Sequence, residues 1–270
     1  MAKIDSTIAD IRHLDRVAEL DSPIHRLDPR AKVAVTALFL ATVVSFPKRE
    51  IVELTALFVY PAILWAVGQV PSRALLRPIL IASPFAILVG LFNPLLDRSV
   101  AVHWGTFAIS GGWMSFISIL VRFLLTVAAA LLLLACTGYV AVCTALGRLG
   151  APRLLVVQFL LLYRYIFVVA DEASRMSRAR ALRSPLARST TIKTWASLVG
   201  HLLLRAYDRG LRLHTAMLCR GFDGQFRSLR SLHWFWTDSC FLFGCTAFFF
   251  VARFGHVADR TGSLMMRIFQ

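Results

Sequence analysis

The sequence predicts an all-α polytopic membrane protein, with about five transmembrane helices and long cytoplasmic helices between the last two of them. Hydrophobic residues make up 57% of the 270 residues and charged residues only 17%, which leaves too little polar surface to coat a soluble protein of this size. The net charge of +15 is unevenly distributed. Residues 147–234 carry 15 Lys and Arg against four Asp and Glu, whereas residues 1–30 carry five against six. The chain therefore combines lipid-soluble segments with one strongly basic segment.

The N-terminal segment, residues 1–30, is expected to lie in the cytoplasm as a short amphipathic helix on the membrane surface. Isoleucine, leucine and valine recur at helical spacing between charged residues as far as Leu20, and Asp21-Ser22-Pro23 ends the pattern. No apolar stretch precedes Ala31, so we expect no cleavable signal peptide and insertion through the internal helices.

Residues 31–146 are expected to form transmembrane helices 1–4. The first is short for a span, so lysine side chains that reach the interface, or local thinning, would complete the crossing. The third contains Pro84, Asn93 and Pro94, which free backbone groups that only neighbouring helices could satisfy. Arg122 in the fourth is expected to face the bundle interior in a structural role. The apolar stretches are 31–46, 51–70, 79–96 and 114–146, with a Gly- and Trp-bearing connection at 97–113.

The positive-inside rule places the basic segment, residues 147–234, in the cytoplasm. Counting back one side per span also puts the N-terminus in the cytoplasm, and only Lys48 and Arg49 run against the rule. Residues 235–270 then hold the last span, at 236–251, and an external C-terminal tail. We therefore expect a multi-pass protein of the inner cell membrane.

Two amphipathic helices are predicted within the basic segment, one ended by Ser184-Pro185 and one, from about 191 to 219, ended by Gly221. Residues 154–170 of the first are apolar enough to cross the membrane. However, Arg164 lies between two tyrosines, a pattern typical of headgroup depth. We favour a helix at the cytoplasmic interface, and the alternative of a further span stays open.

Each of these helices carries an arginine between small residues near its C-terminal end, at Ala179-Arg180-Ala181 and at Cys219-Arg220-Gly221. A helix C-terminus favours a cation, and guanidinium is well suited to bidentate contacts with carboxylates. Small neighbours let such a helix end enter a groove without a steric clash. We predict docking into an acidic groove of a cytoplasmic protein, against the alternative that each arginine only contacts lipid headgroups.

Residue patterns for catalysis, metal binding and nucleotide binding are not found in the sequence. The seven histidines and five cysteines show no metal-ligand spacing, and no G-x-S-x-G or Walker A pattern occurs. Asp171 and Glu172 point about 100° apart on a helix and have basic neighbours one turn away, so an ion pair is expected rather than a catalytic pair. The basic segment adjoins membrane helices, which argues against nucleic acid. We expect no catalytic residue, no metal site and no cofactor.

Arg180 and Arg220 lie within longer motifs, at 162–183 and 216–224, and a further motif lies between them at 204–209. Two more motifs lie elsewhere in the chain, Asp28-Pro29-Arg30-Ala31-Lys32 before the first span and Ala151-Pro152-Arg153 after the fourth. These motifs resemble the transmembrane T component of energy-coupling-factor (ECF) transporters, and the cobalt-type CbiQ family matches best. The resemblance implies a scaffold that is neither a pore nor an enzyme. Its two coupling helices would cross in the cytoplasm and dock two ABC-type ATPase subunits (CbiO-like).

The resemblance also implies a third partner, a metal-binding S component (CbiM-like, with or without a CbiN-like small subunit), held by the apolar faces of the coupling helices in the lipid membrane. This chain departs from the family's Ala-Arg-Gly pattern at Ala181 and Cys219, but both replacements are small. The implied ATPase-docking residues are Ala179, Arg180, Ala181, Cys219, Arg220 and Gly221, and the implied supporting residues of the coupling helices are Tyr163, Arg164, Asp171, Glu172, Arg175 and Phe222.

Three other functions stay open. A nickel- or vitamin-specific T component would carry the same motifs, because in this family the S component selects the cargo. A self-contained channel or secondary transporter would need paired polar residues at mid-membrane depth or inverted repeats. An intramembrane enzyme would need a nucleophile and a base in the spans. Neither requirement is evident in the sequence, so the cobalt-type T component is the favoured interpretation.

Overall fold

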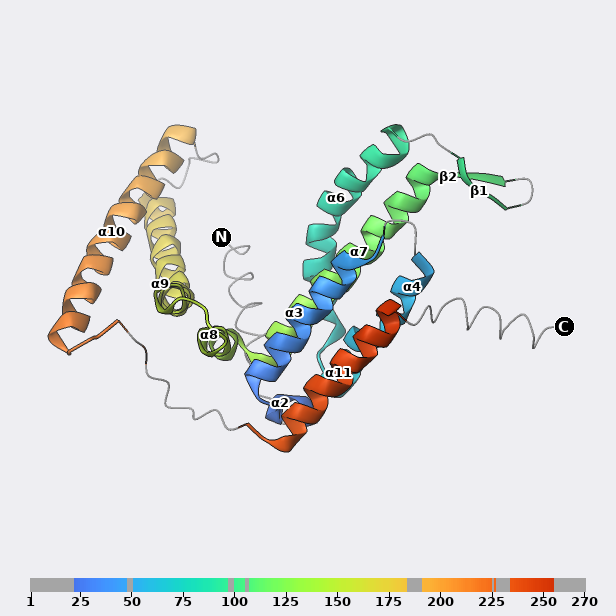
Figure 1. Cartoon of the computed structure of the whole chain (residues 1–270). Helices are drawn as coiled ribbons and strands as arrows, with labels where there is room; N and C mark the ends of the chain where they lie inside the picture. Colours follow the sequence, from blue (N-terminus) through green and yellow to red (C-terminus); the bar gives the residue numbers. More distant parts are fainter. Residues whose placement is uncertain are drawn as a thin grey trace. The chain divides into compact units, whose positions relative to one another are not determined.

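The computed structural model divides the chain into two compact units (Figure 1). We call residues 14–142 with 232–270 the membrane unit, and residues 143–231 with 1–13 the helix-pair unit. The expected surface helix before Ser22, the pair Lys48-Arg49, the stop signal Ser184-Pro185 and the tail after Phe254 lie outside the described residues. The structure describes residues 22–47, 51–96, 100–104, 107–183, 191–224, 226 and 234–254.

Helices α3, α5, α7 and α11 enclose the core of the membrane unit. Phe39 of α3, Tyr60 of α5 and Phe249 of α11 meet with ring centroids 4.7, 5.4 and 5.3 Å apart, and all three side chains are buried. α7 packs against α3, α5 and α6, and α11 lies along α3 (Figure 1). The helices of this unit are α2 (Pro23–Arg26), α3 (Pro29–Ser45), α4 (Ile51–Ala56), α5 (Val59–Gly68), α6 (Ser72–Leu96), α7 (Gly111–Thr137), the start of α8 (Tyr139–Arg148) and α11 (Trp236–Phe254).

Four described helices are long and apolar enough to cross a membrane. Three of them, α6, α7 and α11, are spans that the sequence predicts. The fourth is α9 (Arg153–Arg183), whose placement at the interface stays a prediction. α3 has 17 residues, in keeping with a short first span. The all-α, multi-pass membrane fold class is confirmed.

A short hairpin is the exception to the helical fold. Strands β1 (Val100–Trp104) and β2 (Phe107–Ser110) pair antiparallel within the expected connection 97–113. The sequence contains a signal for this hairpin that a hydropathy average does not detect. Val100, Val102 and Trp104 occupy every second position of β1, and Gly105 follows directly.

Two predicted spans are interrupted rather than continuous. The run 114–146 breaks at Gly138, whose φ of +80° is left-handed and whose N–H donates to the Leu134 carbonyl at 2.8 Å, as in an αL cap. The run 51–70 divides into α4 and α5, with a turn at Leu57 and Phe58 between them. Hydropathy misses both breaks because each lies within a longer stretch that is apolar on average.

Proline in α6 has a local solution. Pro84 has no N–H to donate to the carbonyl of Leu80, four residues earlier. The Ser83 hydroxyl of the same helix donates to that carbonyl at 3.0 Å. The expectation that only neighbouring helices could satisfy the freed backbone groups is therefore wrong at this position.

Two arginines from other helices hold the C-terminal end of α3. Arg122 of α7 donates to the carbonyls of Phe46 and Pro47, at 2.9 and 2.8 Å. Arg253 of α11 donates to the Ser45 carbonyl at 3.3 Å, and its guanidinium lies 4.9 Å from the ring centroid of Phe46. Because the last carbonyls of a helix lack helical partners and carry partial negative charge, both cations are well placed there. Arg122 thus has a structural role.

Candidate functional site

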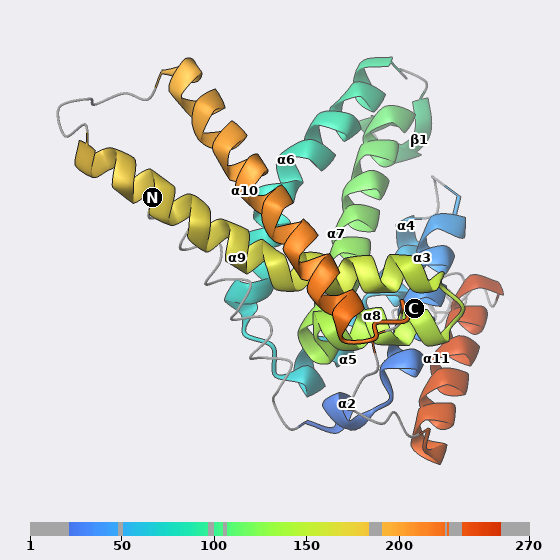
Figure 2. The same cartoon turned by 90° about the vertical axis from the view of Figure 1, so that its left-hand side faces the viewer.

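The two long helices of the helix-pair unit are α9 and α10 (Ile192–Cys219), which are antiparallel and cross each other (Figure 2). The start of α9 and both bounds of α10 agree with those predicted from the sequence. Thr191 has an extended backbone and is the N-cap of α10, so the start of this helix coincides with a residue type that favours such a position.

An ion pair joins the two helices. Arg205 of α10 donates to the carboxylate of Glu172 on α9. The Glu172 side chain is 20% exposed and that of Arg205 is 62% exposed, so water screens the pair and its contribution to stability is below about 1 kcal/mol. Sequence reasoning expects an ion pair at Glu172, but with a basic neighbour on its own helix. It misses Arg205, because the contact depends on how the two helices cross.

A groove of about 590 Å³ lies between α9 and α10. The side of the groove formed by α9 is mainly apolar, with leucine and valine side chains around Glu172, whereas α10 contributes Leu202, Leu213 and Met217 together with charged residues such as Arg205 and Asp208. One face of α10 is half-buried, and the other residues of this helix are exposed. Of this face, Leu202, Ala206, Leu213 and Met217 line the groove, and Thr194 and Leu198 continue it toward the start of the helix.

A second apolar stripe on α10 is exposed. Val199, Leu203, Tyr207 and Leu211 recur every four residues, and 51% to 69% of each is exposed. Nothing in the described part of the chain covers them, and exposed apolar surface of this extent marks contact with lipid or with another protein. α9 contributes a similar exposed row, made of Leu155, Phe159, Leu162 and Ile166.

The end of α10 has the geometry of a Schellman motif. The N–H of Phe222 donates to the Met217 carbonyl at 3.0 Å, and the N–H of Gly221 donates to the Leu218 carbonyl at 3.0 Å. Gly221 has a φ of +76°, which glycine adopts without the steric cost of a side chain. Arg220 is the C-cap and is exposed. The predicted stop at Gly221 is confirmed, and it presents the arginine at the turn.

The end of α9 differs. Arg180 lies in the last turn of the helix and is half-buried, whereas Ala179 and Ala181 beside it are exposed. Cys219, the small residue before the other arginine, is also exposed as the last residue of α10. Small exposed residues therefore lie beside both arginines. Arg180 belongs to the last helical turn of α9, whereas Arg220 is the C-cap of α10.

The two arginine-bearing ends face away from each other along the helix pair. The C-terminal end of α9 adjoins the connection 184–190, and the C-terminal end of α10 lies at the far end of that helix (Figure 2). With 28 residues in α10, the separation is on the order of 40 Å. The two ends therefore belong to two separate parts of the surface of the helix pair.

The supporting residues lie along α9 and just beyond α10. Tyr163 packs edge-on against Phe167, with ring centroids 5.3 Å apart, and Phe222 lies 5.4 Å from the ring of Phe226. Arg164, Asp171 and Arg175 are exposed. Among the described residues no three His, Cys, Asp or Glu side chains gather as metal ligands would.

Two known proteins are similar to this chain over most of its length, and a third over about a third of it. EcfT, the energy-coupling factor transporter transmembrane protein of Limosilactobacillus fermentum, is 31% identical over 257 residues, which cover 87% of this chain and 94% of the relative. EcfT of Heliobacterium modesticaldum is 31% identical over 230 residues, covering 78% and 84%. The cobalt transport protein CbiQ of Rhodobacter capsulatus is 36% identical over 87 residues, covering 32% and 36%.

The sequence profile of the CbiQ family, described as cobalt transport protein, matches residues 21–232. This range includes α3 to α10 and both arginine-bearing helix ends. The chain therefore belongs to the CbiQ family and is a transmembrane T component of an energy-coupling-factor transporter.

Proposed function

We propose that this chain is the scaffold and energy-coupling subunit of an ECF-type importer for cobalt ions. It carries ATP-driven motion from two CbiO-like ATPase subunits to a CbiM-like S component, with or without a CbiN-like small subunit. The observation that supports it best is the position of Arg180 and Arg220 at opposite ends of two crossing helices, on the order of 40 Å apart. Cobalt as the cargo rests on the family description and on the name of the Rhodobacter capsulatus relative.

Each arginine enters an acidic groove on one ATPase in this proposal. The exposed guanidinium of Arg220 leaves a capped helix end, and Arg180 leaves the last turn of α9 between two alanines. Closing of the ATPase pair on nucleotide shifts these ends relative to each other and thus changes the angle at which α9 and α10 cross. The Glu172–Arg205 pair lies at the groove between the helices and keeps their register during this movement.

The exposed apolar rows of α9 and α10 hold the S component. Leu203 is 69% exposed at the middle of the α10 row, so an acidic residue there places a charge in the contact. We expect Leu203→Glu to lose the S component on purification and to retain both ATPases. Retention of the S component by this variant would assign the stripe to lipid instead.

The proposed topology places the N-terminus and residues 147–234 in the cytoplasm, with α9 at the interface. Cys219 is exposed and offers a natural label for this test. A membrane-impermeant maleimide should label Cys219 in inverted vesicles and not in right-side-out vesicles. Cys219→Ser identifies signal from the other cysteines, and labelling in right-side-out vesicles would reverse the orientation.

Charge reversal at both helix ends tests the docking. The full-length chain with Arg180→Glu and Arg220→Glu should insert in the membrane at wild-type level and lose both ATPases on affinity purification. A control with Arg153→Glu and Arg209→Glu changes the net charge of the helix-pair unit equally, at exposed residues outside the two arginine motifs. It should retain the ATPases. Retention by the first variant, or loss by the control, would contradict docking through the helix ends.

Single reversals measure the number of sites. Arg180→Glu alone and Arg220→Glu alone should each leave one ATPase per chain, which the mass of the purified complex in detergent reports. Uptake of labelled Co²⁺ into proteoliposomes of the wild-type complex, with excess unlabelled Ni²⁺ as competitor, tests the cargo. Competition as strong by Ni²⁺ as by Co²⁺ would favour a nickel transporter with the same scaffold.

A further inference from the structure

The start of α3 contacts the chain on both sides of the helix-pair unit. The chain leaves the membrane unit after Val142 and returns at Leu232. Cys136 at the end of α7 lies seven residues before Cys143, where the helix-pair unit begins, and Asp238 at the start of α11 lies seven residues after Ser231, where it ends. Residues of the Asp28-Pro29-Arg30-Ala31-Lys32 motif bind at both of these places.

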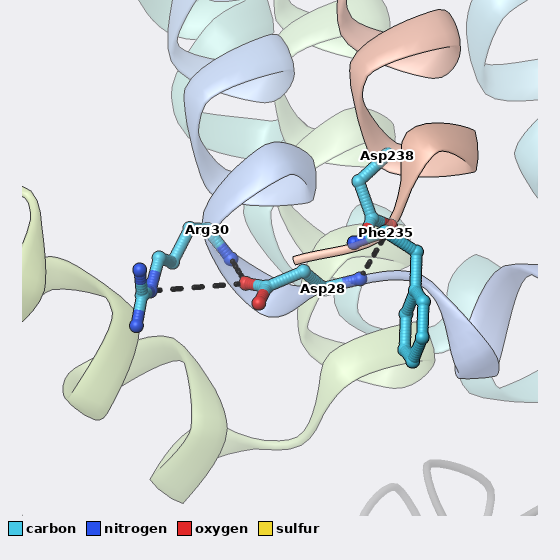
Figure 3. A network of polar contacts seen from close by, with 4 residues as sticks. All are labelled: Asp28, Arg30, Phe235 and Asp238. Atoms are coloured by element: carbon cyan, nitrogen blue, oxygen red, sulfur yellow. Dashed lines mark hydrogen bonds and ion pairs between the residues drawn. The ribbon is translucent and has the colours of Figure 1, made fainter. Parts of the chain in front are cut away.

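At the return, Asp238 connects α11 to α3 (Figure 3). One oxygen of its carboxylate accepts the N–H of Asp28 and the other accepts the N–H of Phe235, both at 2.8 Å. Asp28 is the N-cap of α3, and Phe235 directly precedes α11. Asp238 is fully buried, so a single carboxylate satisfies backbone donors at the N-terminal ends of two helices.

The Asp28 side chain caps the start of α3. Its Oδ1 accepts the N–H of Arg30 at 2.8 Å, and the Arg30 Nε lies 4.0 Å from the same oxygen (Figure 3). Pro29 follows as the first helical residue, where its fixed φ suits a helix. The backbone N–H that binds Asp238 is therefore held in place by local contacts of the motif.

Where the chain leaves the membrane unit, Lys32 binds the C-terminal end of a helix. Its ammonium group donates to the Cys136 carbonyl at 3.1 Å, and only 3% of Lys32 is exposed. Cys136 lies in the last turn of α7, where carbonyls lack helical partners and favour a cation. Gly138 ends the helix directly afterwards. The lysine thus fixes the end of α7 just before the chain turns into α8.

We infer that the Asp28–Lys32 motif is a junction clamp. It binds the end of α7, where the chain leaves the membrane unit, and the start of α11, where the chain returns, so that movement of the coupling helices reaches the membrane unit. The inference rests on the proposed coupling function. Both contacts bring a buried charge to a helix end, and a buried charge is costly to separate from its partner. The clamp therefore resists stretching at the two places where α7 and α11 connect to the moving helices. Asp28, Lys32 and Asp238 are positioning residues in this mechanism.

Hydrogen exchange tests the contact without reference to transport. Asp238→Ala in the full-length complex leaves the N–H groups of Asp28 and Phe235 without their acceptor, so we expect about tenfold faster exchange in the peptides that contain them. Thr237→Ala changes an exposed residue in the same turn and should leave the exchange unchanged. Asp238→Asn, which keeps the shape and one acceptor oxygen, replaces the alanine variant if that variant does not fold. Unchanged exchange in the Asp238 variant would overturn the clamp.

Transport measurements test the consequence. In proteoliposomes, Asp238→Asn and Lys32→Met should keep the ATPases and their ATP hydrolysis, while the substrate imported per ATP hydrolysed falls about fivefold or more. A merely structural role would lower hydrolysis and import in proportion, so an unchanged ratio together with faster exchange would refute the role in coupling. If the wild-type chain itself binds no ATPases, the proposed function fails, and the exchange result still decides whether the clamp exists.

Discussion

Replacing Arg122 by methionine tests whether the polar contacts between helix ends stabilise the membrane unit. Methionine keeps much of the length and apolar volume of arginine and removes both donors. The Phe46 and Pro47 carbonyls then lose hydrogen bonds of 2.9 and 2.8 Å to a charged group. Hydrogen bonds to charged groups contribute about 1.5–3 kcal/mol each, and Arg122 is only half-buried, so we take the lower value for both. The expected loss in the free energy of unfolding is about 3 kcal/mol.

Thermal unfolding of the purified chain in detergent measures this loss. A change of 3 kcal/mol lowers the melting temperature by roughly 5–10 °C in a chain of this size. Arg253→Met removes one longer hydrogen bond, of 3.3 Å, and a cation–π contact with Phe46, so its expected cost is about 1 kcal/mol. Arg209→Met, at an exposed residue of α10, is the control and should melt as wild type does.

The order of the melting temperatures of the variants is as informative as the size of each change. Because Arg122 and Arg253 bind adjacent carbonyls of one helix end, the double variant should deviate from the sum of the single variants. If Arg122→Met melts within 1 °C of the wild type, or if Arg253→Met is the more damaging change, the helix-end argument is refuted. The C-terminal end of α3 would then depend on apolar packing alone.

Three further outcomes follow from the described contacts. Glu172→Arg and Arg205→Glu should each weaken ATP-driven import, and their combination should restore it, because the pair sets helix register rather than stability; a double variant as poor as the singles would contradict this. Gly221→Ala should weaken ATPase binding, since a left-handed φ of +76° costs a non-glycine residue about 1 kcal/mol or more. Gly210→Ala is the control, because a Cβ at this position meets open space, and it should leave ATPase binding unchanged. Ser83→Ala should lower the melting temperature by a few degrees through loss of about 1 kcal/mol, and an unchanged melting curve would show that lipid or water replaces the hydroxyl.

The sequence predicts the helix-pair unit better than the membrane unit, for a physical reason. α10 matches its prediction because a period of 3.6 residues, an N-cap at Thr191 and a stop at Gly221 are all local signals. In the membrane unit, lipid and protein core are both apolar. Hydropathy therefore passes through the turn at Leu57 and the break at Gly138 without a change.

Contacts between distant segments are the other part that sequence reasoning misses. The resemblance to a family singles out the Asp28–Lys32 motif but gives it no partner. Asp238, which binds the Asp28 N–H from 210 residues away, has no motif around it at all. Similarly, Arg205 lies within the amphipathic helix predicted from about 191 to 219, but its pairing with Glu172 depends on the crossing of two helices. The periodicity of a sequence contains no information about which distant residues meet in the folded chain.

The ionisable residues of the membrane unit also bear on the choice between a scaffold and a self-contained transporter. A charge inside a membrane domain is commonly part of an ion path or a proton relay. Here Lys32, Arg122 and Arg253 bind carbonyls at helix C-terminal ends, and Asp238 binds N–H groups at helix N-terminal ends. Each charge is thus bound to a backbone terminus and complements the local helix dipole. These four side chains connect elements of the membrane unit to one another, which favours the proposed scaffold over a self-contained transporter.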